Sequence, residues 1–249
     1  MKYVPKLKEM PEIPADKLPV SEMFYSIQGE GRFAGCPALF IRLKYCNLGC
    51  SWCDTRFTWD SDKIEAGELL TNYEITEKAI KLTGKRNDIM PSIHVVITGG
   101  EPMLHQLKIP KLISIMKKNG FAIFEIETNG MYVPTDEMKE AISWWNCSPK
   151  LTNNGLDKRV NIVPEALRVI SDTKRADFKF VVRNSEDITE LENDYMKYIP
   201  KENIMLMPEG WTVRKQKESM PWVMKICREK GLRFSPRLHI LSWNNARGK

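Results

Sequence analysis

The sequence predicts an α/β protein whose parallel strands form a partial, TIM-like barrel of about six strands. The chain has 249 residues, a length that suits a single α/β domain spanning residues 1–249. Short β-branched or aromatic runs alternate with helical patterns, which indicates parallel strands joined by crossover helices. Polar motifs follow several different strands. This favours a barrel, because an open sheet usually gathers its site in one crevice.

The predicted elements begin after a proline-rich segment, residues 1–20, which we expect to form an extended arm. Strands are expected at 38–43, 93–98, 121–127, 144–147, 177–182 and 204–207. Helices are expected at 75–83, 106–118, 136–142, 186–198 and 215–230. Within 106–118, Pro110 falls in the first turns and Gly120 follows the end, where these residues are favoured. A last apolar run, 237–241, is expected to close the pattern as a strand.

Charge and hydropathy limit the classes of partner that the protein could bind. Lysine and arginine total 38, aspartate and glutamate total 32, and the formal net charge is +6. The charges are scattered, which indicates a solvated surface rather than a nucleic-acid interface. No apolar run reaches the roughly 18 residues of a membrane-spanning helix, and no signal-peptide pattern opens the chain. We therefore expect a cytoplasmic protein with neither a membrane nor a nucleic-acid partner.

Three of the six cysteines are clustered. Cys46, Cys50 and Cys53 have the spacing C-x3-C-x2-C, and the remaining cysteines are scattered. Three thiolates on one loop can hold three corners of a cubic iron–sulfur cluster and leave the fourth iron open to a ligand. Two alternatives remain: a zinc site, for which no fourth ligand is evident, and a redox pair, which leaves one cysteine unexplained.

Two further motifs follow later strands. The sequence Thr98-Gly-Gly-Glu101-Pro102 follows the second predicted strand, where glycines permit close backbone approach and Glu101 could meet an ammonium group. The segment Glu125-Ile-Glu127-Thr-Asn-Gly130 ends the third, and strand alternation places both glutamates on one face. Taken by itself, the glycine motif is better explained as a tight strand-to-helix turn.

These motifs together resemble the radical S-adenosylmethionine (SAM) superfamily. The resemblance implies a [4Fe–4S] cluster on the three cysteines, with SAM on the open iron. Before the first predicted strand, the chain reads Ser26-Ile-Gln-Gly-Glu-Gly31, and the cysteine loop ends in Cys53-Asp54-Thr55. With Ser148-Pro-Lys150 and the late Arg237-Leu-His239, this stretch is similar to the 7-carboxy-7-deazaguanine synthase family. The similarity runs from about residue 24 to the end of the chain.

The family resemblance implies roles for three sets of residues. The substrate-binding set is Ile27, Gln28, Gly29, Glu30, Arg42, Thr98 and His239. The SAM-binding set is Trp52, Cys53, Asp54, Gly100, Glu101, Glu127, Ser148, Pro149, Lys150, Met207, Pro208, Glu209 and Gly210. The metal-binding set is Cys46, Cys50 and Cys53 for the cluster, and Thr55 for Mg²⁺.

Some of these residue types suit their implied roles. The amide of Gln28 matches a guanine-like edge, and the planar fork of Arg42 matches a carboxylate. A surface ion pair is the alternative for Arg42, and a histidine packed in a strand is the alternative for His239. Met207 stands where the family resemblance implies glutamine, so a side-chain hydrogen bond is not expected there. Residues 242–249 have no implied role.

The resemblance also implies a reaction. The family converts 6-carboxy-5,6,7,8-tetrahydropterin to 7-carboxy-7-deazaguanine and ammonia, on the route to queuosine and related 7-deazapurines. The reduced cluster cleaves SAM to a 5′-deoxyadenosyl radical, which takes hydrogen from C6 of the pterin before the ring contracts. SAM is regenerated, and Mg²⁺ holds the substrate carboxylate. The implied partners are the pterin, an electron-donor protein such as flavodoxin or ferredoxin, and a second copy of the chain.

Two other functions are open at this point. A radical SAM activase that makes glycyl radicals would share the cysteine and GGEP motifs, but should lack SIQGEG and the threonine of C-D-T. A non-enzymatic iron–sulfur or zinc module that binds tRNA would need a basic cluster interleaved with aromatic residues. No such cluster is evident in the sequence.

Overall fold

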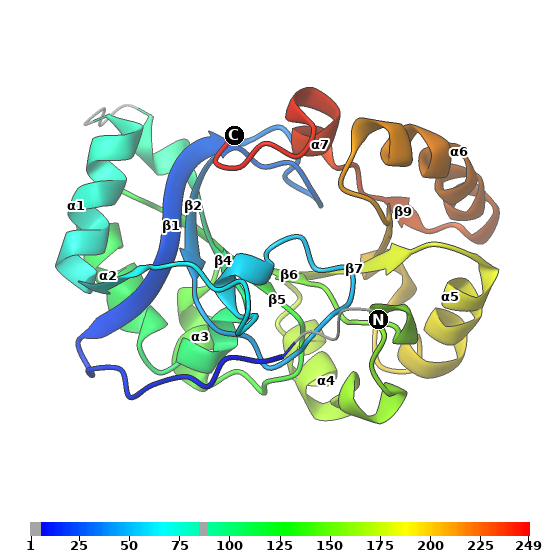
Figure 1. Ribbon diagram of the computed structural model, residues 1–249, viewed down its shortest axis with the longest axis horizontal. Helices are drawn as coiled ribbons and strands as arrows, with labels where there is room; N and C mark the ends of the chain where they lie inside the picture. Colours follow the sequence, from blue (N-terminus) through cyan, green and yellow to red (C-terminus); the bar gives the residue numbers. More distant parts are fainter. Residues whose placement is uncertain (1–5, 85–88) are drawn as a thin grey trace.

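The computed structural model describes residues 6–84 and 89–249, which form a nine-stranded sheet within those ranges. The strand order is β3-β1-β2-β4-β5-β6-β7-β8-β9. Its centre is a run of parallel strands: β2 (Pro37–Leu43), β4 (His94–Gly99), β5 (Ile123–Thr128), β6 (Trp144–Cys147), β7 (Ala176–Val182) and β8 (Ile204–Pro208). These are the strands predicted from sequence, so the partial barrel is confirmed (Figure 1).

Two strands that the sequence did not predict extend the sheet at one end. β1 (Lys17–Ile27) pairs antiparallel with β2, and β3 (Glu68–Thr71) pairs antiparallel with β1. The expected arm over 1–20 is therefore wrong at its end, because residues from Lys17 onward belong to the sheet. Pro19 obscured the strand. It is tolerated because it lies just before a register shift between Val20 and Glu22, an irregularity where proline commonly occurs.

At the other end of the sheet, the last predicted strand is a helix. A two-residue strand, β9 (Arg233–Phe234), pairs with β8, and the run 237–241 falls in α7 (Leu238–Trp243). The amides of Ile240 and Leu241 both donate to the carbonyl of Arg237, which turns the chain out of the sheet. Figure 1 shows α7 between the β1–β2 end of the sheet and the last long helix. The barrel is open, and α7 lies across the opening.

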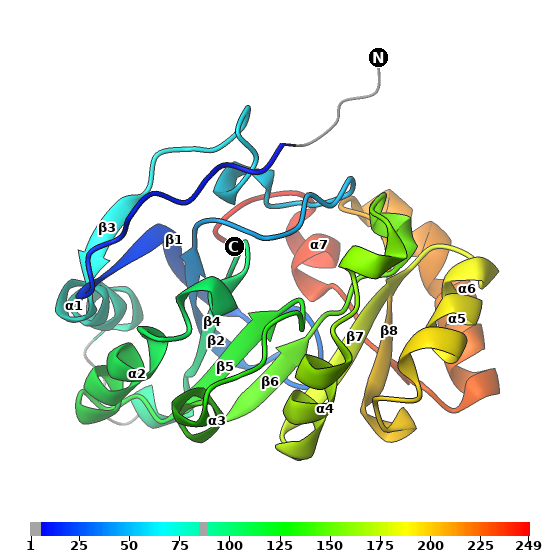
Figure 2. The same cartoon turned by 90° about the horizontal axis from the view of Figure 1, so that it is seen from below.

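The crossover helices largely match the prediction. They are α1 (Asn72–Thr83), α2 (Ile109–Lys118), α3 (Asp136–Ala141), α4 (Pro164–Asp172), α5 (Ser185–Glu190) and α6 (Val213–Lys230). The predicted helix at 186–198 divides into α5 and a π-helical turn, Leu191–Tyr195, and α4 was not predicted. Figure 2 shows α2 to α6 along the outer side of the curved sheet. Within the described ranges, no helix is long and apolar enough to cross a membrane.

The two faces of the parallel strands have different chemistry, because side chains alternate along a strand. Outward side chains form the main hydrophobic core with the helices: Val95, Ile97, Phe124, Ile126, Trp145, Phe178, Phe180, Val182, Ile204 and Leu206 are all buried in it. Inward side chains are mostly polar, and among those buried are His94, Thr98, Glu125, Asn146, Asp177 and Lys179. A small separate cluster of Ala38, Phe40 and Val96 completes the inner surface. The helices thus stabilise the fold from outside and leave the interior for polar groups.

The outer core predicts a large stability effect at Trp145, whose side chain is fully buried. We expect Trp145→Ala to lower the free energy of unfolding by about 3–5 kcal/mol, because no neighbour can fill so large a cavity. Urea denaturation followed by circular dichroism measures this change. Trp243→Ala is the control. That ring is 41% exposed, so its loss should cost under about 1 kcal/mol. Equal losses in both variants would contradict the assignment of the core to the outer face.

Candidate active site

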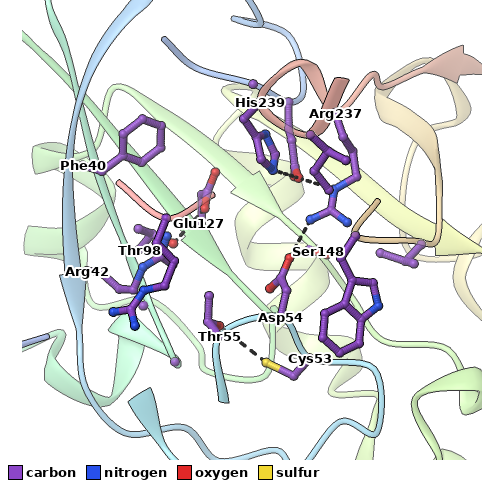
Figure 3. Close-up of a pocket in the computed structure, with 18 of the residues that line it drawn as sticks. Phe40, Arg42, Cys53, Asp54, Thr55, Thr98, Glu127, Ser148, Arg237 and His239 are labelled. Carbon is purple, nitrogen blue, oxygen red and sulfur yellow. Dashed lines mark hydrogen bonds and ion pairs between the residues drawn. The ribbon is translucent and has the colours of Figure 1, made fainter. Parts of the chain in front are cut away.

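A cavity of about 290 Å³ occupies the barrel interior and opens at the carboxyl ends of the strands. Every residue predicted to bind substrate or metal lines it: Ile27, Gln28, Gly29, Glu30, Arg42, Thr98, His239, Cys46, Cys50, Cys53 and Thr55. Most of the predicted SAM-binding set lines it too: Trp52, Asp54, Gly100, Glu127, Ser148, Lys150, Met207, Glu209 and Gly210. Glu101, Pro149 and Pro208 do not. Figure 3 shows side chains from both sides of the barrel around one space.

The cysteine loop follows β2 directly, and each of its three sulfurs accepts a hydrogen bond. The amide of Leu48 lies 3.4 Å from Cys46 Sγ, and Asn154 Nδ2 lies 3.7 Å from Cys50 Sγ. The indole nitrogen of the buried Trp59 lies 3.3 Å from Cys53 Sγ. Donors of this kind stabilise charge on thiolate ligands and tune the potential of an iron–sulfur cluster. Three thiols on one cavity wall, each with a donor, fit the ligand set of such a cluster.

Burial raises the pKa of Cys46, and the nearby Glu101 raises it further. Burial also raises the pKa of Cys50. Both groups are therefore thiols at neutral pH, and binding iron would release their protons. Among the described residues, no three Cys, His, Asp or Glu side chains are grouped around a position for a single metal ion.

The other cysteines lie away from the cavity. All six cysteines are free, but Cys36, Cys147 and Cys227 are not among the lining residues. The thiol of Cys227 donates to the carbonyl of Arg233 at 3.4 Å, so it acts as a packed, protonated side chain.

The two glycines of the GGEP turn are required by packing against the cysteine loop. A Cβ on Gly99 would lie 2.1 Å from the carbonyl oxygen of Leu43, and one on Gly100 would lie 2.1 Å from that of Tyr45. Gly99 also has a φ of +143°, which disfavours any side chain. The turn therefore holds the start of the cysteine loop against the end of β4.

The expectation that Glu101 meets an ammonium group concerns a side chain that does not line the cavity. It is fully buried and accepts hydrogen bonds from the amides of Met103 (2.9 Å) and Asn129 (2.7 Å) and from the Thr128 hydroxyl (2.8 Å). Burial raises its pKa despite these donors. Because Thr128 and Asn129 do line the cavity, Glu101 acts through them as a positioning residue.

The glutamates of β5 share the inner face as predicted, but they lie at different depths. Glu127 lines the cavity, and the Thr98 hydroxyl donates to it at 2.7 Å. Glu125 lies outside the lining and hydrogen-bonds with His94 and Asn146. Glu127 is thus available to a ligand, whereas Glu125 fastens neighbouring strands together.

The segment after β1 brings an unpaired amide into the cavity. The side chain of Gln28 is 2% exposed, and its oxygen accepts from the amide of Glu30 at 3.2 Å. Its Nε2 has no hydrogen-bond partner among the described residues. A buried donor without a partner is costly, so this nitrogen is suited to an acceptor on a bound molecule.

Contacts between Gly29 and the first residues of α7, Leu238 and His239, fix the segment after β1 against this helix. The amide of Leu238 donates to the Gly29 carbonyl at 2.9 Å, and a Cβ on Gly29 would lie 2.2 Å from His239 Nδ1. His239 therefore sits in a helix rather than a strand and faces the cavity, with Nε2 3.8 Å from Glu30 Oε1. Burial lowers the pKa of His239, so the imidazole is neutral at pH 7 and can accept or donate a hydrogen bond.

Two cavity-lining cations were given no site role from the sequence, although Arg237 belongs to the late motif Arg237-Leu-His239. Lys179 projects inward from β7 and forms an ion pair with Glu30, and Arg237 Nε lies 2.9 Å from Glu30 Oε1. Burial would raise the pKa of Glu30, but Lys179 and Arg237 hold it well below its ordinary value. For Lys179, the sequence did contain a signal of a site role, because it is a single lysine at an inward position of the apolar strand DFKFVV.

The wall beside Arg42 is formed partly by the end of the chain. Arg42 Nε lies 2.8 Å from Glu22 Oε1, so the ion pair weighed as the alternative for Arg42 is present, and it lies in the cavity. Arg247 contacts Glu22 at 3.1 Å and Glu65 at 2.9 Å, with its guanidinium 3.6 Å from the ring centroid of Phe57. Residues 244–249, which had no predicted role, thereby line the site.

The charge on Glu30 predicts a pH-dependent stability difference. Glu30→Gln leaves the buried Lys179 without its carboxylate and leaves Arg237 with Asp54 as its remaining carboxylate, and we expect a loss of about 3–5 kcal/mol at pH 7. Because the folded-state pKa of Glu30 is depressed, its contribution is complete above the ordinary value of 4.5 and is lost as pH falls further. The difference from wild type should therefore shrink below about pH 4.5.

Denaturant titrations at several pH values measure this difference. The control is Glu68→Gln, which removes an exposed ion pair with Lys78 and should change stability by under about 1 kcal/mol. A constant penalty for Glu30→Gln between pH 7 and pH 3 would contradict a depressed pKa.

Comparison with known proteins places this site in a family. Residues 40–199 match the family model described as the radical SAM superfamily. A 7-carboxy-7-deazaguanine synthase from Pyrobaculum aerophilum is 36% identical over 92% of this chain and 96% of its own length. One from Hyperthermus butylicus is 33% identical over 90% of this chain and 92% of its own length.

Solved structures agree. The crystal structure of QueE from Escherichia coli superposes with a TM-score of 0.66 at 28% identity, covering 90% of this chain and 95% of that one. The structure of native anSMEcpe with bound AdoMet has a TM-score of 0.53 at 16% identity over 76% of this chain, and shares the fold. With three cysteines on one wall of an open barrel and full-length similarity to these relatives, the chain belongs to the 7-carboxy-7-deazaguanine synthase family of the radical SAM superfamily.

Proposed function

We propose that this protein converts 6-carboxy-5,6,7,8-tetrahydropterin to 7-carboxy-7-deazaguanine with release of ammonia, using SAM catalytically. The observation that carries the proposal is the joint lining of one cavity by the cysteine loop and by Gln28. The loop offers three thiols with hydrogen-bond donors, and Gln28 offers a buried, unpaired amide nitrogen. The relatives that match over nine-tenths of the chain carry the same activity in their names.

The three cysteines would hold a [4Fe–4S] cluster, and residues on the same side of the cavity would hold SAM. The cluster and SAM supply the one-electron chemistry that forms a 5′-deoxyadenosyl radical. Lys150 Nζ, which donates to the Ser148 hydroxyl at 2.9 Å, offers a cation, and Gly100, Asp54 and Glu127 offer polar groups. We also propose that Trp52, Met207, Glu209 and Gly210 contact SAM. Pro149 and Pro208 would act only by shaping the adjacent backbone, since neither lines the cavity.

Other residues of the cavity wall suit the pterin. Gln28 Nε2 can donate to the carbonyl of the pterin ring, and Glu30, kept anionic by two cations, can accept from its N–H groups. His239 is neutral and faces the same space, while the backbone of Ile27 and Gly29 and the hydroxyl of Thr98 complete the surface. Arg42 would exchange its contact with Glu22 for the substrate carboxylate, which its planar fork can bind at two points.

We also propose the domain organisation, the oligomeric state, the electron donor and the compartment of the protein. A single domain over residues 1–249, a homodimer and a one-electron donor such as flavodoxin or ferredoxin follow from the family resemblance. A cytoplasmic setting suits six free cysteines, because reducing compartments keep thiols available for iron. The activase alternative is weaker, since the glycyl-radical type of reaction gives no reason for a buried amide and an anionic carboxylate at the cavity wall.

The central test is anaerobic reconstitution with iron and sulfide, followed by addition of SAM, a reductant and the carboxylated tetrahydropterin. Wild type should form 7-carboxy-7-deazaguanine. Cys50→Ala should lose the cluster and all activity, because it removes one of three ligands. Cys36→Ala should keep both, since Cys36 does not line the cavity. A bound cluster and SAM cleavage without deazapurine would refute the proposed substrate.

A second test addresses Mg²⁺. Thr55 lines the cavity with its hydroxyl 3.5 Å from Cys53 Sγ, and hydroxyl oxygens are suitable ligands for a hard cation. We propose that Mg²⁺ bound there orients the substrate carboxylate. Thr55→Ala should raise the Mg²⁺ concentration for half-maximal activity about tenfold, the loss expected for one ligand contact worth about 1.4 kcal/mol. Thr76→Ala is the control, because that buried hydroxyl lies in α1, outside the cavity, and donates to the Asn72 carbonyl at 2.8 Å. An unchanged Mg²⁺ response in Thr55→Ala would remove this residue from the metal site.

A further inference from the structure

One guanidinium joins three segments of the cavity wall that are far apart in the sequence. Arg237 Nε lies 2.9 Å from Glu30 Oε1, and its Nη2 lies 2.6 Å from Asp54 Oδ2. Its Nη1 donates to the carbonyl oxygen of Gly210 at 2.8 Å. Figure 3 shows Arg237 beside His239, with the carboxylate of Asp54 pointing toward it from the cysteine loop. Each arm of the planar fork therefore holds a different segment.

The three segments serve two different ligands in the function proposed above, because Asp54 and Gly210 are assigned to SAM and Glu30 to the pterin. Glu30 belongs to the pterin side, Asp54 to the end of the cysteine loop, and Gly210 to the loop after β8 on the SAM side. Among the contacts of residues 6–84 and 89–249, no second group is found that hydrogen-bonds to all three. Lys179 reaches Glu30, and Gln216 Nε2 reaches the Gly210 carbonyl at 2.7 Å, but only Arg237 joins these segments to Asp54 among the contacts of the described residues.

The geometry of the contact requires arginine. Arg237 is 8% exposed, and its bonds leave the guanidinium in three directions within one plane. A lysine in the same place keeps the charge but presents a single nitrogen, which cannot reach three separated acceptors. The contribution of Arg237 is thus a fixed spacing between segments, in addition to neutralising two carboxylates.

We propose that Arg237 is a positioning residue that sets the separation of the pterin and SAM subsites, and so keeps radical formation coupled to product formation. The inference rests on the proposed function. A displacement of about 1 Å between reacting groups can slow a reaction by roughly a hundredfold. If the two subsites drift apart, SAM cleavage continues while hydrogen transfer to and from the pterin fails. In uncoupled turnover the added reductant supplies one electron for each SAM cleaved, and the 5′-deoxyadenosyl radical takes its hydrogen atom from a thiol in the assay mixture instead of the pterin. 5′-Deoxyadenosine is then released without deazapurine.

The experiment compares Arg237→Lys, Arg237→Gln and Arg233→Gln after identical reconstitution. Arg233 is the matched control, since it pairs with the buried Asp177 at 2.6 Å but does not line the cavity. The main measurement is the ratio of 5′-deoxyadenosine to 7-carboxy-7-deazaguanine formed. We expect at least a fivefold rise in both Arg237 variants, a fall in kcat larger than the change in KM for the pterin, and a near-wild-type ratio in Arg233→Gln.

A binding measurement on the cluster-free protein separates placement from chemistry. Titration with the carboxylated tetrahydropterin should show Arg237→Lys binding less than about tenfold more weakly than wild type, because the lysine still compensates the charge of Glu30. Iron content and melting temperature should match wild type in Arg237→Lys. If Arg237→Gln does not fold, the comparison is made with Arg237→Lys alone.

Each outcome decides the inference. An unchanged product ratio in a folded, cluster-loaded Arg237→Lys overturns it. Failure of both Arg237 variants to fold also overturns it, by making Arg237 a structural residue only. A wild-type protein that cleaves SAM but makes no deazapurine refutes the proposed function instead, whatever the variants do.

Discussion

The active-site cavity depends on the opposite chemistry of the two faces of the parallel strands. Outward side chains such as Val95, Phe124 and Trp145 pack under the helices and supply the apolar burial that holds the barrel. The interior side chains therefore need not supply the apolar burial that stabilises the fold. It can carry Thr98, Glu127 and Lys179, polar groups that a filled barrel would exclude. A cavity lined by polar residues is possible because the core lies elsewhere.

Placing charges in that interior has an energetic cost, which the structure meets by pairing them. Glu30 faces Lys179 and Arg237, and Arg237 also faces Asp54. Buried ion pairs seldom add net stability, but removing one partner leaves an uncompensated charge. This arrangement keeps Glu30 ionised across the physiological pH range. It also links the segment before β2, the cysteine loop and the start of α7, so the electrostatics of the site and its shape are set by the same contacts.

The cysteine loop is also held in place by contacts that serve its chemistry. Its sulfurs receive hydrogen bonds from Leu48, Trp59 and Asn154, and the GGEP turn packs against its first residues with no room for a side chain. Glu101, though part of the motif, lies behind the wall and fixes Thr128 and Asn129. Motif residues thus divide into those that face the cavity and those that hold the facing residues in place.

The sequence alone determined the central strands, the cysteine set and most of the cavity lining. Hydrophobic periodicity and local motif spacing are properties of short segments, so they can be read from the sequence without knowledge of the tertiary contacts. Glu101 shows the limit of this reasoning, because its motif identified the region but not the direction of its side chain. β1 was missed because Pro19 hides a strand that only pairing with β2 and β3 stabilises.

Tertiary structure alone decided the remaining features. His239 lies in a helix because the chain turns after β9 and the amide of Leu238 donates to the carbonyl of Gly29, which lies 209 residues earlier in the sequence. Arg237 and Lys179 became site residues because folding brings them to Glu30. Residues 244–249 line the cavity through contacts of Arg247 with Glu22 and Glu65. Such long-range pairings depend on how the whole chain folds around the open barrel, which no local pattern in the sequence encodes.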